Sequence, residues 1–168
     1  MKKLLPFYAI VLFPYLIVFI LISIFKGYFT DDFLLFLLIT LVVLYVVAIV
    51  CAIAGFMKGV TKKYQPQEIL RINMMIKLLH IPAYLLIFVF GLLCTITIFT
   101  IGVTVVLMIL DGMTIVLSGL VGLGGIIGSL REKKISTNKA VIHGILQFVY
   151  CADVISSIVM YRTVKASQ

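Results

Sequence analysis

The stretch VIHGILQFVYCADVISSIVMYR, from Val141 to Arg162, decides how this chain is expected to fold. It has the length and apolar weight of a membrane-crossing helix, because about 20 apolar residues cover the roughly 30 Å hydrocarbon core of a bilayer. It also carries a histidine, a glutamine and, near its middle, Asp153. An ionisable side chain inside a membrane segment faces other protein or water and avoids lipid. The stretch therefore predicts a helix that depends on partner helices.

The polar side chains of this stretch gather on one face of a helix. At about 100° per residue they cover roughly 120° of the helix surface, and the rest is apolar. Each central Val, Ile, Leu or Phe favours insertion by about 0.3–0.6 kcal/mol, whereas one central Asp opposes it by about 2.5–3.5 kcal/mol. The segment is therefore marginal as an isolated span. Its polar face consists of His143, Gln147, Tyr150, Asp153, Ser157 and Tyr161.

The composition places the whole chain in a membrane. Of 168 residues, 64% are hydrophobic and 12% are charged. A soluble domain has about 45–50% apolar and about 25% charged residues, and a fold of this size has too little interior to hide the excess. We therefore predict one all-α integral membrane domain over residues 1–168, a bundle of five transmembrane helices. The predicted spans are 4–25, 33–57, 80–110, 113–130 and 140–161.

Two basic connections and two turns separate these predicted spans, and the first turn is marked by Asp31-Asp32. The basic connections are residues 58–79 and 131–139, and the pair Asp111-Gly112 reads as the turn of a hairpin. The third run is longer than a bilayer requires, so we expect tilt or a break near Gly102. Pro66 suits the first position of a helix. Residues 66–79 then either lie in the membrane interface or extend the third span early.

The basic residues orient the predicted bundle. With five spans and the N-terminus inside, eleven Lys and Arg residues fall in inner segments and three in outer ones. This asymmetry predicts a cytoplasmic N-terminus. Arg162 and Lys165 fit poorly, because five spans place them outside. The alternative is four spans, with the C-terminal segment lying on the membrane or dipping into it as an interfacial helix.

The fourth run contains SGLVGLGGIIGS, Ser118 to Ser129. Small residues four positions apart let helix backbones approach closely in lipid. This pattern favours close packing, either within the chain or with a second copy or another membrane protein. The same glycines would also permit an unwound stretch around a ligand, as in broken transporter helices.

The third run has a polar face of its own, continued backwards by Asn73 and Lys77. The third and fifth runs point the same way in the five-span arrangement, so their polar faces can meet. For Asp153 the expected partners are hydroxyl groups, none of them cationic: Thr95, Thr97, Ser118, Tyr45 and Tyr15. We predict a binding site between these two runs, lined by His80, Tyr84, Thr95, His143, Gln147, Tyr150 and Asp153.

Several classes of function lack support in the sequence. The net charge of +8 comes from residues between apolar runs, so lipid bilayer and anionic headgroups are the expected partners and nucleic acid is not. No HExxH, GxSxG or P-loop pattern occurs, so we predict no cofactor, no metal and no catalytic residue. Cys51, Cys94 and Cys151 lie in apolar runs without CxxC spacing and read as small buried hydrophobes.

Two segments resemble parts of known membrane proteins. KLLHIPAYLLIFVFG (Lys77–Gly91) and ADVISSIVMYR (Ala152–Arg162) are similar to segments of small multi-span proteins of low-GC Gram-positive bacteria, families of unknown function. The resemblance implies a bacterial cell membrane and no particular activity. Our leading hypothesis is a binding or transport-related protein. The alternatives are a non-catalytic accessory or immunity-type protein that docks on a membrane partner, and an intramembrane lipid-modifying enzyme.

Overall fold

The computed structural model describes residues 7–27, 30–61, 65–96 and 100–167. Within these ranges every regular element is a helix, which confirms the predicted all-α class. Lys2, Lys3, Lys62, Lys63, Thr97 and the predicted start of the first span at residues 4–6 lie outside them. The helices are α1 (Tyr8–Lys26), α2 (Asp31–Val60), α3 (Pro66–Thr95), α4 (Ile101–Arg131), α5 (Thr137–Leu146) and α6 (Ala152–Ala166).

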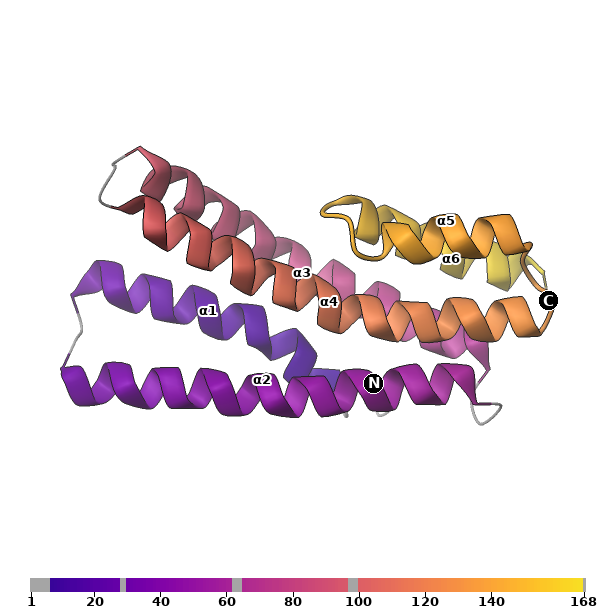
Figure 1. Cartoon of the computed structure of the whole chain (residues 1–168), viewed down its shortest axis with the longest axis horizontal. Helices are drawn as coiled ribbons and strands as arrows, with labels where there is room; N and C mark the ends of the chain where they lie inside the picture. Colours follow the sequence, from indigo (N-terminus) through magenta and orange to yellow (C-terminus); the bar gives the residue numbers. More distant parts are fainter. Residues whose placement is uncertain (1–6, 28–29, 62–64, 97–99, 168) are drawn as a thin grey trace.

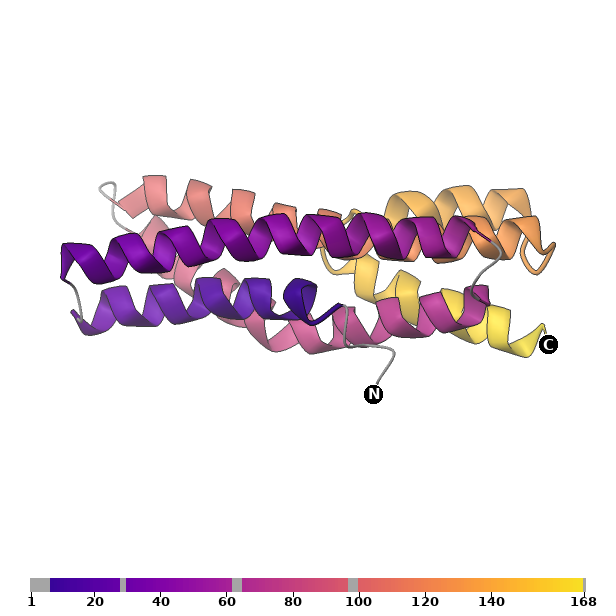
Figure 2. The same cartoon turned by 90° about the horizontal axis from the view of Figure 1, so that it is seen from below.

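Four helices run lengthwise, and two short helices cover half of one side. Figure 1 shows α1 beside α2, α3 beside α4, and the α5–α6 hairpin against the C-terminal half of α4. Figure 2 shows the same lengthwise arrangement from below. Three described helices, α2, α3 and α4, are long and apolar enough to cross a membrane, and Tyr8–Ile24 is a shorter apolar helix. The structure therefore does not confirm five transmembrane helices.

The third helix begins earlier than the predicted third span. It starts at Pro66, which occupies the first turn, and it continues through Pro82 to Thr95. Residues 66–79 are helical and continuous with the rest of α3, as expected if they extend the third span early. The predicted connection at 58–79 is accordingly wrong, because α2 reaches Val60 and α3 begins only six positions later.

The predicted hairpin turn at Asp111-Gly112 is also wrong. Both residues lie inside α4, and the chain reverses between Thr95 and Ile101, next to the break expected near Gly102. An Asp-Gly pair favours a turn in water, yet a glycine inside a helix costs only about 1 kcal/mol. In an apolar setting the continuous helix wins because it satisfies its own backbone groups. Asp111 is thereby carried into the bundle.

The predicted fifth span at 140–161 is two helices with a break between them. Helix α5 ends at Leu146, and α6 begins at Ala152 and runs back beside it (Figure 1). Helices of 10 and 15 residues are too short to cross the hydrocarbon core. Breaking the segment brings Asp153 into the first turn of α6, where the positive end of the helix dipole favours a carboxylate. Two short helices here agree with the four-span alternative on the C-terminal segment, although three described helices are long and apolar enough to cross a membrane.

The glycines of α4 make close contacts within the chain. Gly124 lies directly against Gly59 of α2, and Gly128 approaches both Gly59 and Pro66. A methyl group at Gly125 would stand 2.9 Å from the Leu70 side chain. Helix α4 stays continuous through all of these positions, so the glycines serve packing and not an unwound stretch.

The hairpin returns the C-terminus to the end of the bundle that carries the α4–α5 turn (Figure 1). Arg162 and Lys165 of α6 therefore lie toward the same end as Arg131, Lys133 and Lys134. Five spans would place Arg162 and Lys165 at the opposite end, where basic residues fit poorly, and the structure does not place them there.

Candidate functional site

A buried ion pair joins α3 to the hairpin. Lys77 Nζ lies 2.8 Å from Asp153 Oδ2, and both side chains have an exposed fraction of 0%. The same ammonium donates to the backbone oxygen of Gln147 at 3.0 Å. One lysine therefore binds both the first turn of α6 and the end of α5. These contacts compensate the charge of Lys77 and fix α5 and α6 relative to each other.

Amides and hydroxyls extend this ion pair into a polar cluster. Asn73 Nδ2 donates to Gln147 Oε1 at 3.1 Å and to Ser157 Oγ at 2.9 Å. Gln147 Nε2 donates to Ser156 Oγ at 3.3 Å, and His143 Nδ1 lies 3.0 Å from the same hydroxyl. Asn73, Gln147 and both serines are buried. We call these residues the docking cluster: Asn73, Lys77, His143, Gln147, Asp153, Ser156 and Ser157.

His143 is the most exposed end of the docking cluster. It lies on α5, outside the helices that are long enough to cross a membrane. Partial burial, and then the positive charge of Lys139, lower the pKa of His143 below its ordinary value. The ring is therefore neutral near pH 7, so one ring nitrogen can accept while the other donates.

Two glycines of α4 make room for the hairpin break. A Cβ at Gly122 would lie 2.5 Å from both Asn73 Nδ2 and Gln147 Oε1. A Cβ at Gly119 would lie 2.7 Å from the Phe148 ring. Both distances are under 3.0 Å, which is too close for a real Cβ atom. Residues 147–148 of the break can therefore pack against α4 only where α4 has no side chain.

His80 serves the contact between α1 and α3. Pro14 lies inside α1 and has no N–H, so the carbonyl of Ile10, four residues earlier, lacks its helical donor. His80 Nε2 lies 3.1 Å from that oxygen and replaces the missing donor, because a carbonyl can only accept. The Tyr84 hydroxyl lies 3.4 Å from the other ring nitrogen, Nδ1. Tyr15 of α1 donates in return to Leu79 O, in the turn before Pro82.

A cavity of about 460 Å³ lies between α3 and α4, next to the hairpin break. Its walls are mostly apolar, and Tyr150 from the break closes one end. Phe88, Leu92 and Met108 line it, yet 56%, 59% and 70% of their surfaces are exposed. The cavity therefore opens on the side of the bundle. Its volume falls within the usual range for small-molecule sites.

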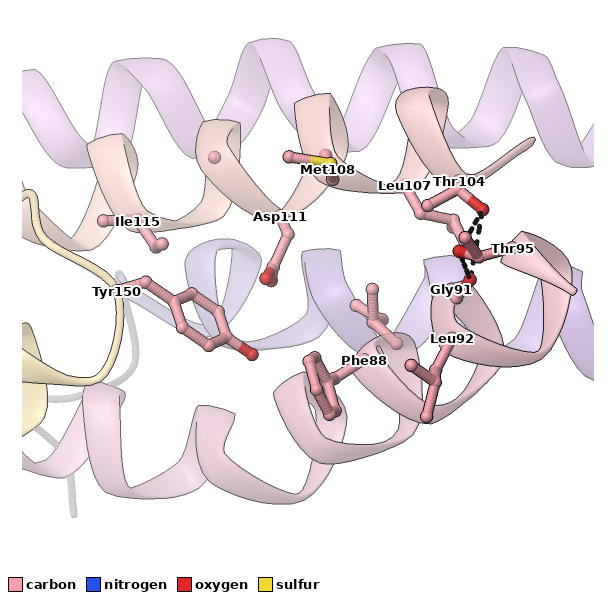
Figure 3. Close-up of a pocket in the computed structure, with 12 residues that line it drawn as sticks. Phe88, Gly91, Leu92, Thr95, Thr104, Leu107, Met108, Asp111, Ile115 and Tyr150 are labelled. Carbon is pink, nitrogen blue, oxygen red and sulfur yellow. Dashed lines mark hydrogen bonds between the residues drawn. The ribbon is translucent and has the colours of Figure 1, made fainter. Parts of the chain in front are cut away.

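Asp111 supplies the charge in this cavity. Figure 3 shows its carboxyl directed into the space, toward which the Tyr150 hydroxyl also points. Asp111 is 9% exposed, and its Oδ1 has no hydrogen-bond partner among the described residues. At the far end Thr95 and Thr104 both donate to Gly91 O, so their hydroxyl hydrogens are already engaged. Burying a polar group without a partner is costly. A ligand in the cavity could supply the hydrogen bond that Asp111 Oδ1 lacks.

The structure divides the sequence-predicted site into three places. Gln147, Asp153 and His143 belong to the docking cluster. Tyr150 and Thr95 line the cavity. His80 and Tyr84 lie between these, tied to each other and to α1. The predicted meeting of the third run with the C-terminal segment therefore holds, but the seven residues do not line one common pocket.

Two charged residues lie in places that differ from their predicted ones. The predicted hydroxyl partners of Asp153 are wrong, because its partner is Lys77, a residue of the predicted connection. Asp111, the predicted turn residue, lines the cavity instead. Signals for both were present: Lys77 falls on the polar face of the third run, and Asp111 is the one charge in fifty residues from Ile81 to Leu130.

Few polar side chains line the cavity. Among the residues that the structure describes, no group of three or more His, Cys, Asp or Glu side chains could hold a metal ion. Lys77 and Asp153 are committed to each other, so neither is a free base or nucleophile. What the arrangement offers is a mostly apolar space with one carboxyl and one phenol.

Comparison with known proteins identifies a family. The model of the Family of unknown function (DUF6652) matches residues 2–166. No curated protein and no solved structure matches the chain. Because the match covers nearly the whole sequence, this protein belongs to the DUF6652 family.

Proposed function

We propose that this protein is an integral membrane protein that binds a small amphiphilic molecule between α3 and α4, in the service of sensing or transporting it. The observation that carries this proposal is Asp111, a buried carboxyl with an unpartnered oxygen aimed into a mostly apolar cavity. A ligand with a polar end and an apolar body fits such a space. Small-molecule sites commonly combine apolar walls with a few polar groups that fix orientation.

The proposed setting is a bacterial cell membrane, with the basic end of the bundle in the cytoplasm. The mean hydropathy of +1.29 and the three long apolar helices support a membrane location. Arg131, Lys133, Lys134 and the C-terminal Arg162 and Lys165 gather toward one end and would contact anionic headgroups there. The hairpin then dips partway into the bilayer from the cytoplasmic side, with Gln147 of its break buried and Phe148, Val149 and Tyr150 exposed.

The cavity opening supports entry from the lipid phase. Its rim residues Phe88, Leu92 and Met108 are exposed on the side of the bundle, where a bilayer would surround them. Asp111 is the eleventh residue of α4, about 15 Å along the axis from its start at about 1.5 Å per residue. A ligand would therefore arrive laterally with its apolar body already in the membrane.

The hairpin acts as a fixed floor in this proposal. Tyr150 reaches the cavity from the break, and the break is held by Lys77 and by Asn73. Rigid support of a ligand-contacting side chain lowers the ordering cost of binding. The docking cluster thus positions Tyr150 without touching the ligand.

Photolabelling tests the proposal. The protein is reconstituted in phosphatidylcholine nanodiscs with a ten-carbon alkyl alcohol carrying a diazirine, irradiated, digested and analysed by mass spectrometry. We expect labels enriched at Phe88, Leu92, Met108 and Tyr150 over the exposed residues of α2, which bulk lipid contacts equally.

Two glycines of α4 provide a matched pair of variants. Gly112 lines the cavity and Gly102 does not, and a Cβ at either position meets nothing within 4 Å. Gly112→Phe should fill the cavity and remove the enrichment, while Gly102→Phe should keep it. Labelling that follows surface exposure alone, and that is unchanged by Gly112→Phe, would refute the proposed site.

A further inference from the structure

We propose that the cavity selects an organic monoamine: a ligand with one protonated amino group at Asp111 and an apolar body along Phe88, Leu92 and Met108. This rests on the proposed function and names the chemical class of its ligand.

Asp111 has no cation of its own. Within the described part of the chain it takes part in no ion pair, and its Oδ1 accepts no hydrogen bond. The buried cation of the interior, Lys77, is held by Asp153 Oδ2 at 2.8 Å and by Gln147 O at 3.0 Å. The carboxyl that faces the cavity is therefore left for a cation that comes from outside the chain.

An amine suits the cavity better than an inorganic ion does. Mg²⁺ and Ca²⁺ take six or more oxygen ligands, and the cavity offers one carboxyl, one phenol and two threonine hydroxyls that already donate to Gly91 O. An alkylammonium group needs only a few acceptors. The Tyr150 hydroxyl can accept one of its hydrogens, and the Tyr150 and Phe88 rings offer π-faces to a cation.

An anionic ligand does not suit the cavity. Its lining contains no Lys, Arg or His side chain, so a carboxylate or phosphate would meet Asp111 without compensation. Like charges at close range in an apolar environment repel strongly. A neutral alcohol could enter, but it would forgo the charge-assisted hydrogen bond that distinguishes an ammonium.

The test compares three ligands that differ only in the head group. In nanodiscs, 4-phenylbutylamine, 4-phenylbutanol and 4-phenylbutyrate compete with the diazirine alcohol for labelling of the cavity. We expect the amine to compete best, and Asp111→Asn to weaken it by about tenfold to a hundredfold, in line with a hydrogen bond to a charged group. Asp111→Glu should retain the preference for the amine. Asp31→Asn, which removes an exposed carboxyl at the start of α2, should leave it unchanged.

Folding does not confound this comparison, because Asp111 Oδ1 has no hydrogen-bond partner among the described residues and Asn has nearly the same shape. Thermal unfolding of each variant is measured alongside. Equal competition by amine and alcohol, a preference for the carboxylate, or no effect of Asp111→Asn would each overturn the amine assignment while the cavity site stands. Loss of cavity-specific labelling itself would overturn the binding site as well.

Discussion

Lys77 and Asp153 are 76 positions apart in the sequence and meet at 2.8 Å with neither side chain exposed. The pair joins a helix long enough to cross a membrane to a helix that is too short to do so. Through its second bond, to Gln147 O, Lys77 also holds the end of α5. The position of the hairpin, and of the Tyr150 that it presents to the cavity, therefore depends on one ammonium group.

Removing one charge of this pair should be worse than removing both. Lys77→Met or Asp153→Asn leaves an uncompensated buried group, which typically costs about 3–5 kcal/mol, whereas loss of both charges is often nearly neutral. We expect each single variant to lower the free energy of unfolding by that amount, and the double variant to recover most of it. Equilibrium unfolding in mixed micelles of dodecyl maltoside and SDS measures the four free energies.

The pair Lys134–Glu132 is the control for this cycle. Its atoms are 2.9 Å apart, but the side chains are 19% and 37% exposed. Exposed pairs contribute about 0–1 kcal/mol. Equal coupling energies for the two pairs would show that burial does not strengthen the Lys77–Asp153 interaction and would contradict the proposed anchoring.

Gly122→Ala should loosen the hairpin. The added methyl group would stand 2.5 Å from Asn73 Nδ2 and from Gln147 Oε1, so the docking cluster must shift. Overpacking of this kind costs about 1–3 kcal/mol. We expect faster amide hydrogen exchange in α5 and α6 with little change in α2. Gly112→Ala is the matched control, because its Cβ meets nothing within 4 Å and alanine favours a helix. Identical amide exchange of α5 and α6 in the two variants would refute the close packing of the docking cluster against Gly122.

The C-terminus should lie on the same side of the membrane as the α4–α5 turn. Single cysteines are placed at Ser167 and Lys133 in a variant without the three native cysteines. In intact cells the two sites should show the same reactivity as each other toward an impermeant maleimide, and they should do so again in inverted vesicles. A cysteine at Thr30, at the opposite end of the bundle, should show the reverse pattern. Opposite reactivity at Ser167 and Lys133 would restore the five-span arrangement.

Periodicity predicts several of the buried polar positions, although Tyr150 and Thr95 on the same predicted faces are exposed. Asn73, Lys77, His80 and Tyr84 share one face of the third run, and all four are buried. The polar face of the C-terminal stretch likewise turns inward at Gln147, Asp153 and Ser157. These positions follow from the cost of placing polar groups in lipid, which acts on each helix separately.

The break in the C-terminal stretch could not be predicted in the same way. A straight helix would have placed Asp153 about 15 Å beyond His143, far from Lys77, at about 1.5 Å per residue. Folding back at residues 147–151 lets the carboxyl reach the lysine, and that gain depends on a side chain 76 positions away. The helix through Asp111-Gly112 is similar, because apolar surroundings favour a continuous helix over the local turn preference that the sequence displays.

His80 should matter only while Pro14 is present. Pro14 leaves the Ile10 carbonyl without its helical donor, and His80 Nε2 supplies one at 3.1 Å. We expect His80→Leu to destabilise the protein by about 1–3 kcal/mol, the usual cost of an unsatisfied buried acceptor. In a Pro14→Ala background residue 14 can donate to Ile10 again, so the same substitution should cost at least about 1 kcal/mol less. Unfolding of the four proteins in the same mixed micelles gives this coupling energy. An equal cost of His80→Leu in both backgrounds would mean that the histidine stabilises α1 by its packing alone, because the carbonyl left open by the proline would then contribute nothing measurable.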